Sequence, residues 1–443
     1  MIEVNKSKNL LKTIGPGLLF ASTAIGTSHL VLSTRVGATH GMIYFWIILI
    51  ALILKYPFFE MGPRYAAATG YSLVKGYKDQ GTWAVVLFML VVTINMFAVV
   101  GAIGAVSAGL LATMFGVHVV PVPILAGIII GVSVLLLLLG GYKGLDGFIK
   151  LISIVLLVTV SIAFLAVLMK GPATATSDFQ APPIFEGAGL ALLIGLLGWL
   201  PAGIEASTMN SIWTVEKARA TNYQPTLKES LFDFNLGYIF ALVLALMFMT
   251  IGAYTVYGTG VVLDGNATQF SNKLLNVFTQ NLGDWSYYVI AIAAFGTIYG
   301  TLITVMDAFP RCFVRGLRIL KFDTLEKNNN QISFLENAYK WTLIIVGLGG
   351  FSLFYFSAAS MVKLLDAATI MAFLTSPVIA FLNLRAIQSS SVPTSHRPSP
   401  LMLGMAYLGL FALVAFAIYY LICLLYTSPS PRDATLSRMP SSA

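Results

Sequence analysis

Charged residues are scarce in this sequence: Asp, Glu, Lys and Arg together make up 10% of its 443 residues. A soluble globular domain carries about 25% charged residues. Hydrophobic residues make up 58% of the chain, and the mean hydropathy is +0.85. This composition excludes a soluble enzyme, a disordered chain and a fibrous protein.

Motifs for several kinds of chemistry are also missing. There is no Walker A sequence, no His-Glu-x-x-His and no Cys-x-x-Cys, so we expect neither ATP-driven pumping nor an enzyme, and we expect no cofactor. The two cysteines, Cys312 and Cys423, fit no ligand or disulfide spacing. The stretch from Met1 to Lys12 is short and polar and does not have the form of a cleavable signal peptide.

What the sequence has is eleven apolar segments of roughly 20 residues or more, long enough to cross a ~30 Å hydrocarbon layer as helices. We place them at about 14–38, 41–62, 82–113, 122–140, 146–169, 187–214, 230–257, 285–307, 338–358, 362–384 and 400–424. The predicted fold class is therefore an all-α polytopic membrane protein. The stretch 427–443 is rich in Ser and Pro and is expected to be a disordered or artefactual tail.

The basic residues predict the orientation in the bilayer. With eleven spans, 19 of the 26 Lys and Arg residues fall on the side of the N-terminus, and only Arg35, Lys170, Lys273 and Lys363 fall on the opposite side before the tail. The positive-inside rule then predicts a multi-pass protein of the cell (inner) membrane, with a cytoplasmic N-terminus and an external C-terminus. This distribution accounts for the net charge of +8, so we expect no nucleic acid as a partner.

Three of the segments depart from the pattern of plain apolar helices. The first segment begins Gly15-Pro16-Gly17 and is interrupted at 25–29, and the sixth is interrupted at 200–203. The eighth carries Gly and Thr at 296–301. The first and sixth segments occupy corresponding positions if spans 1–5 and 6–10 are two repeats, and paired broken helices of this kind indicate a transporter's binding site.

Polar residues at the two breaks could bind a cation. The first break offers Thr27, Ser28 and His29, and the second offers Glu205, followed by Ser207, Thr208 and Asn210. An ionisable residue at membrane depth is a functional candidate by default. Glu205 could instead cap a helix or pair with Arg35, and His29 could be a ligand, a proton carrier or a buried imidazole. Lys55 and Glu60 in the second span are expected to snorkel or to pair.

The first and sixth segments resemble a known family, the Nramp divalent-metal transporters. The run from Ile14 to Ala38 is similar to the family's first span, which opens Gly-Pro-Gly, breaks at Asp-Pro-Gly-Asn and closes on Gly-Ala. The run from Gly198 to Ser207 is similar to the sixth span, built on Met-Pro-His. The resemblance covers about residues 10–424. It implies a LeuT-type fold, in which spans 1–5 and 6–10 form an inverted repeat, plus an eleventh span.

The residues by which the family binds metal are not kept. The resemblance places the family's metal-binding aspartate at Gly26 and its asparagine at His29. The family's Met-Pro-His falls on Leu200-Pro201-Ala202, so neither the thioether nor the imidazole is present. The two acidic positions of the third span fall on Asn95 and Ala98, and the glutamine of the tenth span falls on Thr369. We therefore expect the scaffold of the family without its usual metal site and proton path.

The expected protein is a secondary transporter in one transmembrane domain, 1–424. Its first repeat is about 14–169, its second about 187–384 and its last span about 400–424. The resemblance implies that a metal cation crosses by alternating access through a site between the broken helices. That site would comprise Gly26, Thr27, Ser28, His29, Leu200, Pro201, Ala202, Glu205, Ser207 and Thr369, with His29 and Glu205 as metal ligands.

Two other functions remain open. An organic solute, such as one resembling an amino acid, could be the substrate, because the small residues Gly26, Ala202 and Gly203 would leave it room. A membrane sensor or an intramembrane enzyme using His29 and Glu205 is the third possibility. The sequence offers neither a partner domain nor a nucleophile constellation for it.

Overall fold

A computed structural model describes residues 13–116, 120–140, 142–322, 329–357 and 361–427, and within these ranges the chain is helical without any strand. The first half contains α2 (Pro16–Ala24), the π-helix η1 (Ser28–Ser33), α3 (Thr34–His40), α4 (Ile43–Thr69), α5 (Leu73–Gln80), α6 (Thr82–Phe115), α7 (Val122–Leu138) and α8 (Tyr142–Lys170). The second half contains α9 (Gly187–Trp199), α10 (Ala206–Thr221), α11 (Leu227–Thr255), α12 (Ala267–Leu282), η2 (Asp284–Ser286), α13 (Tyr287–Phe322), α14 (Asn329–Phe356), α15 (Met361–Ile387), η3 (Thr394–His396) and α16 (Pro400–Thr427). The predicted tail lies outside the described residues apart from its first residue, Thr427.

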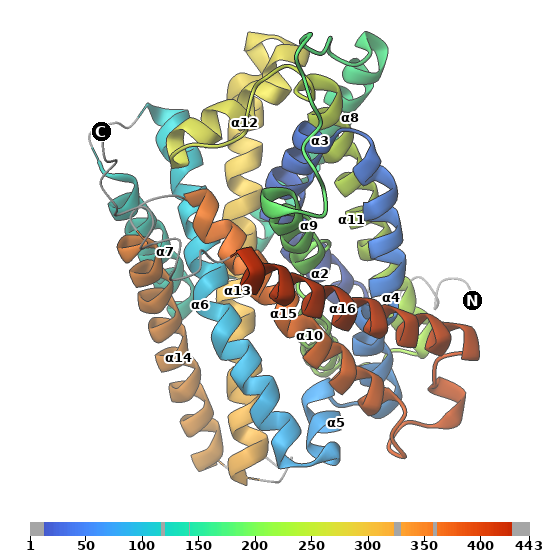
Figure 1. Cartoon of the computed structure of the whole chain (residues 1–443). Helices are drawn as coiled ribbons and strands as arrows, with labels where there is room; N and C mark the ends of the chain where they lie inside the picture. Colours follow the sequence, from blue (N-terminus) through green and yellow to red (C-terminus); the bar gives the residue numbers. More distant parts are fainter. Residues whose placement is uncertain (1–12, 117–119, 141, 323–328, 358–360, 428–443) are drawn as a thin grey trace, which may run out of the picture.

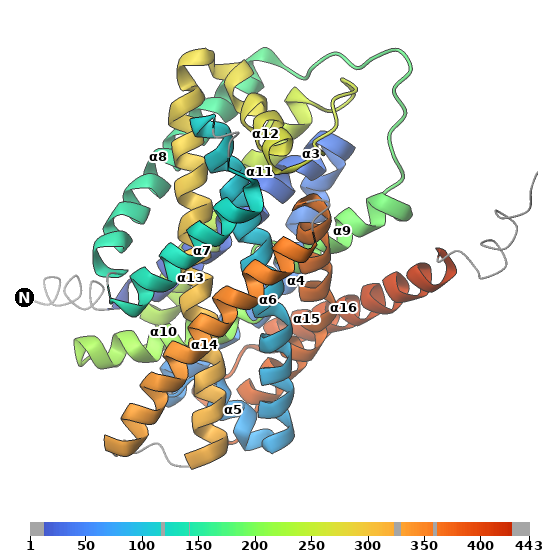
Figure 2. The ribbon, with the colours of Figure 1, turned by 90° about the vertical axis from the view of Figure 1, so that its left-hand side faces the viewer.

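The helices form a membrane-spanning bundle, and the predicted fold class is confirmed. In the described part of the chain, seven helices are long and apolar enough to cross a membrane, and an eighth span is possible if α2 and the helix after its break count as one. The other three predicted segments coincide with shorter apolar helices, at α7, in α8 and at α9. Figure 1 shows α12 at one end of the bundle and α5 at the other, and Figure 2 shows α16 projecting from the bundle.

Both predicted interruptions are breaks in the structure. The first span changes direction by 43° between Ala24 and Ser28. The sixth is unwound between Trp199, where α9 ends, and Ala206, where α10 begins. The Gly and Thr residues at 296–301 lie within α13, which continues through them as regular helix. The Thr hydroxyls there donate to carbonyls of their own helix, and helix is compatible with Gly where neighbouring helices pack closely.

The half-helix α2 is fixed against α11 at its start. The Asp233 carboxylate of α11 accepts hydrogen bonds from the backbone N–H groups of Gly15, at 3.1 Å, and Gly17, at 2.6 Å, which are among the donors that a helix N-terminus leaves without internal partners. The two backbones approach so closely that a methyl group on Gly17 would lie 2.0 Å from the Asp233 carbonyl oxygen. Glycine is therefore required at this crossing.

Candidate functional site

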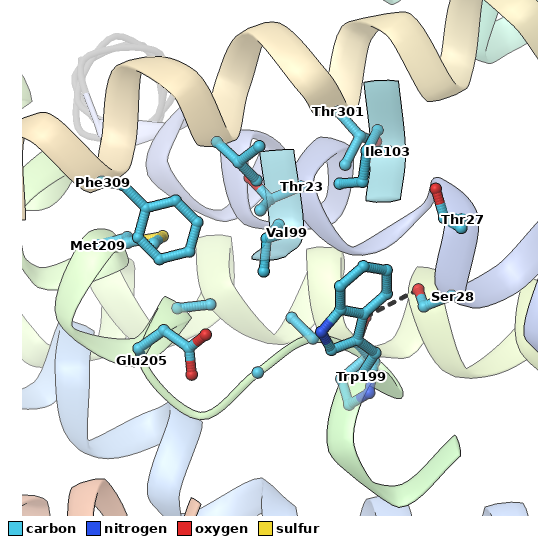
Figure 3. Close-up of a pocket in the computed structure, with 15 residues that line it drawn as sticks. Thr23, Thr27, Ser28, Val99, Ile103, Trp199, Glu205, Met209, Thr301 and Phe309 are labelled. Carbon is cyan, nitrogen blue, oxygen red and sulfur yellow. Dashed lines mark hydrogen bonds between the residues drawn. The ribbon is translucent and has the colours of Figure 1, made fainter. Parts of the chain in front are cut away.

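A small cavity of about 50 Å³ lies between the two breaks. Its lining comes from α2, the first break and the start of η1, from α6, from the end of α9 and the second break, and from α10 and α13. The lining residues are Thr23, Thr27, Ser28, Val99, Ile103, Trp199, Pro201, Ala202, Gly203, Glu205, Ala206, Met209, Thr301, Val305 and Phe309. In the view of Figure 3, Glu205 lies on one side of the cavity, Thr27 and Ser28 lie on the other, and Trp199 is drawn between them. The two interruptions seen in the sequence thus meet in space.

The first break contributes hydroxyl groups to the cavity. Ser28 Oγ lies 2.5 Å from the Ala24 carbonyl oxygen, which the break leaves outside the regular helix ladder, and 3.2 Å from the carbonyl oxygen of Pro201 in the other break (Figure 3). Thr27 is buried, and its Oγ1 has no hydrogen-bond partner among the described residues. A buried hydroxyl without a partner is costly, so Thr27 is available to a ligand.

The second break contributes the carboxylate of Glu205. Among the described residues, it is the only carboxylate that lines the cavity. Glu205 is 4% exposed, and its Oε1 accepts a hydrogen bond of 3.3 Å from the Asn95 side-chain amide of α6. Its Oε2 has no partner among the described residues. Glu205 occupies the N-cap position of α10, but its side chain does not cap the helix. A buried carboxylate with an unused oxygen facing a cavity is suited to a cation.

Glu205 does not pair with Arg35, one of the structural roles considered for it. The Arg35 guanidinium instead donates to Asp366 of α15 at 2.7 Å. This ion pair joins the first and tenth spans. Arg35 and Asp366 thus neutralise each other, and neither residue lines the cavity.

Five of the ten predicted site residues line the cavity, namely Thr27, Ser28, Pro201, Ala202 and Glu205, and five do not. Gly26 instead packs against α13, where a methyl group on it would lie 2.2 Å from Thr301 Oγ1. That hydroxyl donates to the carbonyl oxygen of Ser22 at 3.0 Å, which lies just before the break. The position that the resemblance assigns to an aspartate therefore has no room for a side chain here.

The other four residues are buried in packing contacts. Ser207 accepts a hydrogen bond from Asn383 of α15 at 2.7 Å, and Leu200 is 1% exposed. Thr369 lies where α15 crosses α9 and donates to the carbonyl oxygen of Asp366 at 2.8 Å. A methyl group on Gly198 of α9 would lie 2.1 Å from the Thr369 carbonyl oxygen, so this residue sits at a close helix crossing.

His29 is fully buried and joins the first break to α11. Its Nε2 lies 2.9 Å from the Ala241 carbonyl oxygen, and its Nδ1 lies 2.8 Å from Ser28 Oγ. Because a carbonyl can only accept, Nε2 carries the hydrogen in the neutral ring, and Nδ1 is an acceptor that faces Ser28 Oγ. The single hydroxyl hydrogen of Ser28 also has the carbonyl oxygens of Ala24 and Pro201 within reach. In this conformation His29 could therefore ligate a metal only through Nδ1.

The structure adds lining residues that the sequence reasoning missed. Met209 lies one helical turn after Glu205. Its thioether is the only sulfur atom among the described residues that line the cavity. Met209 is four residues after Glu205, and residues four apart lie on the same face of a helix, so the sequence could have identified it. Phe309 and Thr301 come from α13, and no local signal in the sequence connects that helix to the breaks.

The ligand set of the cavity is dominated by oxygen. The described residues contain no group of three or more His, Cys, Asp and Glu side chains that could hold a metal ion. A cation in the cavity would therefore depend on Glu205, on hydroxyls such as that of Thr27, on backbone carbonyls and on water. Such oxygen ligands suit Mg²⁺, Ca²⁺ and Mn²⁺, and the single thioether of Met209 is the group that would favour a softer ion.

A helical membrane protein with two broken helices around a cavity that holds a carboxylate and several hydroxyl groups has the architecture of a secondary transporter. Comparisons with known proteins give the family. The family described as natural resistance-associated macrophage protein-like, Nramp, matches residues 17–423. The chain belongs to the Nramp family, and the predicted resemblance is confirmed.

Individual relatives agree with this assignment. A protein of Pasteurella multocida (strain Pm70), named as uncharacterized, is 34% identical over 95% of this chain and 94% of its own length. Two crystal structures of a manganese transporter of Eremococcus coleocola are similar in fold, one of a single-residue mutant and one in complex with an aromatic bis-isothiourea compound. Both have a TM-score of 0.71 and cover 97% of this chain and 91% of theirs, at 14% and 15% identity. The fold is thus the LeuT-type fold of Nramp transporters.

Proposed function

We propose that this protein is a secondary active transporter that binds a divalent metal cation in the cavity between the broken first and sixth spans and carries it across the membrane by alternating access. The observation that carries the proposal is the Glu205 carboxylate, buried at the second break with Oε2 unpartnered among the described residues. Membership of the Nramp family supports a metal ion as substrate. The Glu205 carboxylate would supply the negative charge that other members hold in the first span.

The cavity favours a small, hard cation over an organic solute. A volume of about 50 Å³ accommodates an ion with a few water molecules, because one water needs about 10–15 Å³ measured in this way. Of the three small residues expected to leave room for a larger ligand, Ala202 and Gly203 line the cavity. The space beside the third, Gly26, is occupied by Thr301. An amino-acid-like substrate would require a considerably wider site than the one present.

Binding to purified protein tests the proposal. We expect isothermal titration calorimetry to detect Mg²⁺ or Mn²⁺ but no amino acid. We expect Glu205→Gln to lose this binding while retaining expression and melting temperature, because an amide of nearly the same shape removes the charge. Glu186→Gln is the matched control, since Glu186 is exposed at the start of α9, away from the cavity. Normal transport of the cation by Glu205→Gln in proteoliposomes would reject the assignment, and binding of an organic solute alone would favour the alternative substrate.

A further inference from the structure

Lys55 is buried in the middle of the bundle. It lies on α4, is 3% exposed, and does not snorkel toward a membrane surface as its sequence context predicts. Its Nζ donates to three backbone carbonyl oxygens, those of Leu197 at 2.8 Å, Leu200 at 2.7 Å and Ala202 at 3.1 Å. These three carbonyl oxygens satisfy the ammonium within the bundle. The second residue of that prediction, Glu60, does form an ion pair, with Arg64.

The three carbonyls belong to the end of the half-helix α9 and to the unwound segment after it. The last carbonyls of a helix have no partner within the helix and carry the negative end of its dipole. In this span they converge on one point, and an ammonium occupies that point. Backbone carbonyls converging in this way form the kind of site that holds a monovalent cation such as K⁺ in other membrane proteins.

The charge of the ammonium also has a counterpart. Glu205 follows the same unwound segment, and its carboxylate lies against Gly203, the residue after the Ala202 carbonyl that Lys55 binds. Among the described residues no ion pair within 4.0 Å joins Lys55 to Glu205. The Phe59 ring centroid, 5.6 Å from Nζ, provides a further weak attraction for the cation.

We propose that the carbonyls of Leu197, Leu200 and Ala202 form a monovalent-cation site that the chain fills with its own Lys55 ammonium. The site lies beside the substrate cavity and shares Ala202 with it, but Lys55 itself is not among the cavity's lining residues. A tethered cation stabilises the negative end of α9 permanently, so the break requires no Na⁺ or K⁺ from solution. Because α4 is one continuous helix, the ammonium also ties the broken span to an unbroken one.

Melting temperatures of the purified full-length protein test the proposal without depending on transport or on any divalent ion. Each variant is measured at equal ionic strength in choline, sodium, potassium and methylammonium chloride. We expect the unaltered protein to melt within about 1 °C in all four salts, because its site is already filled. We expect Lys55→Ala to melt at least ~5 °C lower in choline, because three buried carbonyl oxygens lose their donor. Choline is too large to enter the vacated site.

Recovery by small cations is the diagnostic result. Methylammonium or K⁺ should restore at least about half of the loss in Lys55→Ala, since a ligand that binds the folded state raises its stability. The control is Lys75→Ala, which removes a partly exposed lysine paired with Asp79 and should show no dependence on the cation. A Lys55→Ala protein as stable as the original in choline, or one restored equally by all four salts or by none, would overturn the proposal.

A second variant, Lys55→Gln, separates the effect of the charge from that of the hydrogen bonds. It tests the proposal even if the alanine variant does not fold in any salt. Its amide can donate to two of the carbonyls but carries no charge. We expect it to be destabilised in choline and to respond to K⁺. If Lys55→Gln instead matches the unaltered protein in choline, the residue acts only as a hydrogen-bond donor and the cation site is rejected. The same conclusion follows if the unaltered protein itself requires Na⁺ or K⁺ to reach its full melting temperature.

Discussion

At the scale of single residues, the direction of the Glu205 carboxylate depends on a neighbouring glycine. A methyl group on Gly203 would lie 2.5 Å from Glu205 Oε1 and 2.6 Å from Oε2. Those atoms are the end of a flexible side chain, so the carboxylate can move away while the backbone stays in place. Gly203 therefore determines the position of the one acidic group that lines the cavity in the described structure.

We expect Gly203→Ala to weaken Mg²⁺ or Mn²⁺ binding by about tenfold or more, which corresponds to about 1.4 kcal/mol, while changing the melting temperature little. The reason is that the methyl group displaces the carboxylate from its present position beside Asn95 without creating a buried hole. Isothermal titration calorimetry measures the dissociation constant. An alanine variant that binds with unchanged affinity would show that the observed carboxylate position is not the binding position.

The preference between hard and soft ions also rests on single residues. The resemblance of the sixth span places Leu200 at the position of the family's methionine, and a leucine offers no lone pair to a metal. We therefore expect the protein to discriminate weakly between Cd²⁺ or Mn²⁺ and hard cations such as Mg²⁺, as measured by competition in calorimetry. If Cd²⁺ is strongly preferred, Met209→Leu should abolish the preference, because Met209 carries the sulfur among the described lining residues. A Cd²⁺ preference that survives this substitution would contradict the ligand assignment.

At the scale of the helix, α2 depends on a cap from another span. The Asp233 carboxylate binds two N–H groups at its start and is itself only 3% exposed. An acidic group at a helix N-terminus is also favoured by the helix dipole. Because α2 leads directly into the first break, its position determines where Thr27 and Ser28 lie.

We expect Asp233→Ala to lower the free energy of unfolding by about 2 kcal/mol, since a cap is lost and buried N–H groups are left unpaired. Thermal unfolding of the purified protein measures the loss. Asp264→Ala is the control, because it removes an exposed aspartate paired with Lys273 and should have little effect. Equal melting temperatures for the two variants would mean that α2 does not need the cap.

At the scale of the whole molecule, the sequence predicted what depends on local patterns. Apolar runs predicted the helices, and Pro and Gly together with the polar residues beside them predicted the two breaks and Glu205. The contacts of Gly26, His29, Thr369 and Lys55 could not be predicted. Each depends on a residue from a distant helix, such as Thr301 for Gly26, and no spacing in the sequence encodes which helices cross there.

The orientation in the membrane is a property of the whole molecule, and its prediction rests on the distribution of basic residues. At one end of the bundle, a cavity of about 510 Å³ is lined by five basic residues, Arg219, Arg311, Arg315, Arg318 and Lys340, with two acidic ones. The segment 258–284, which includes α12, holds one basic residue, Lys273. Because basic loops are retained on the cytoplasmic side, we expect the N-terminus and the 308–337 region inside the cell and 258–284 outside.

Cysteine labelling in intact cells tests this orientation. The background is Cys423→Ser, in which the remaining cysteine, Cys312, is buried. Single cysteines then replace Gln280, exposed on α12, or Asn337, exposed on α14. We expect a membrane-impermeant maleimide to label the cysteine at position 280 in intact cells, and the cysteine at position 337 only after the cells are opened. Labelling of position 337 but not 280 in intact cells would reverse the orientation, and the basic cavity would then face the outside.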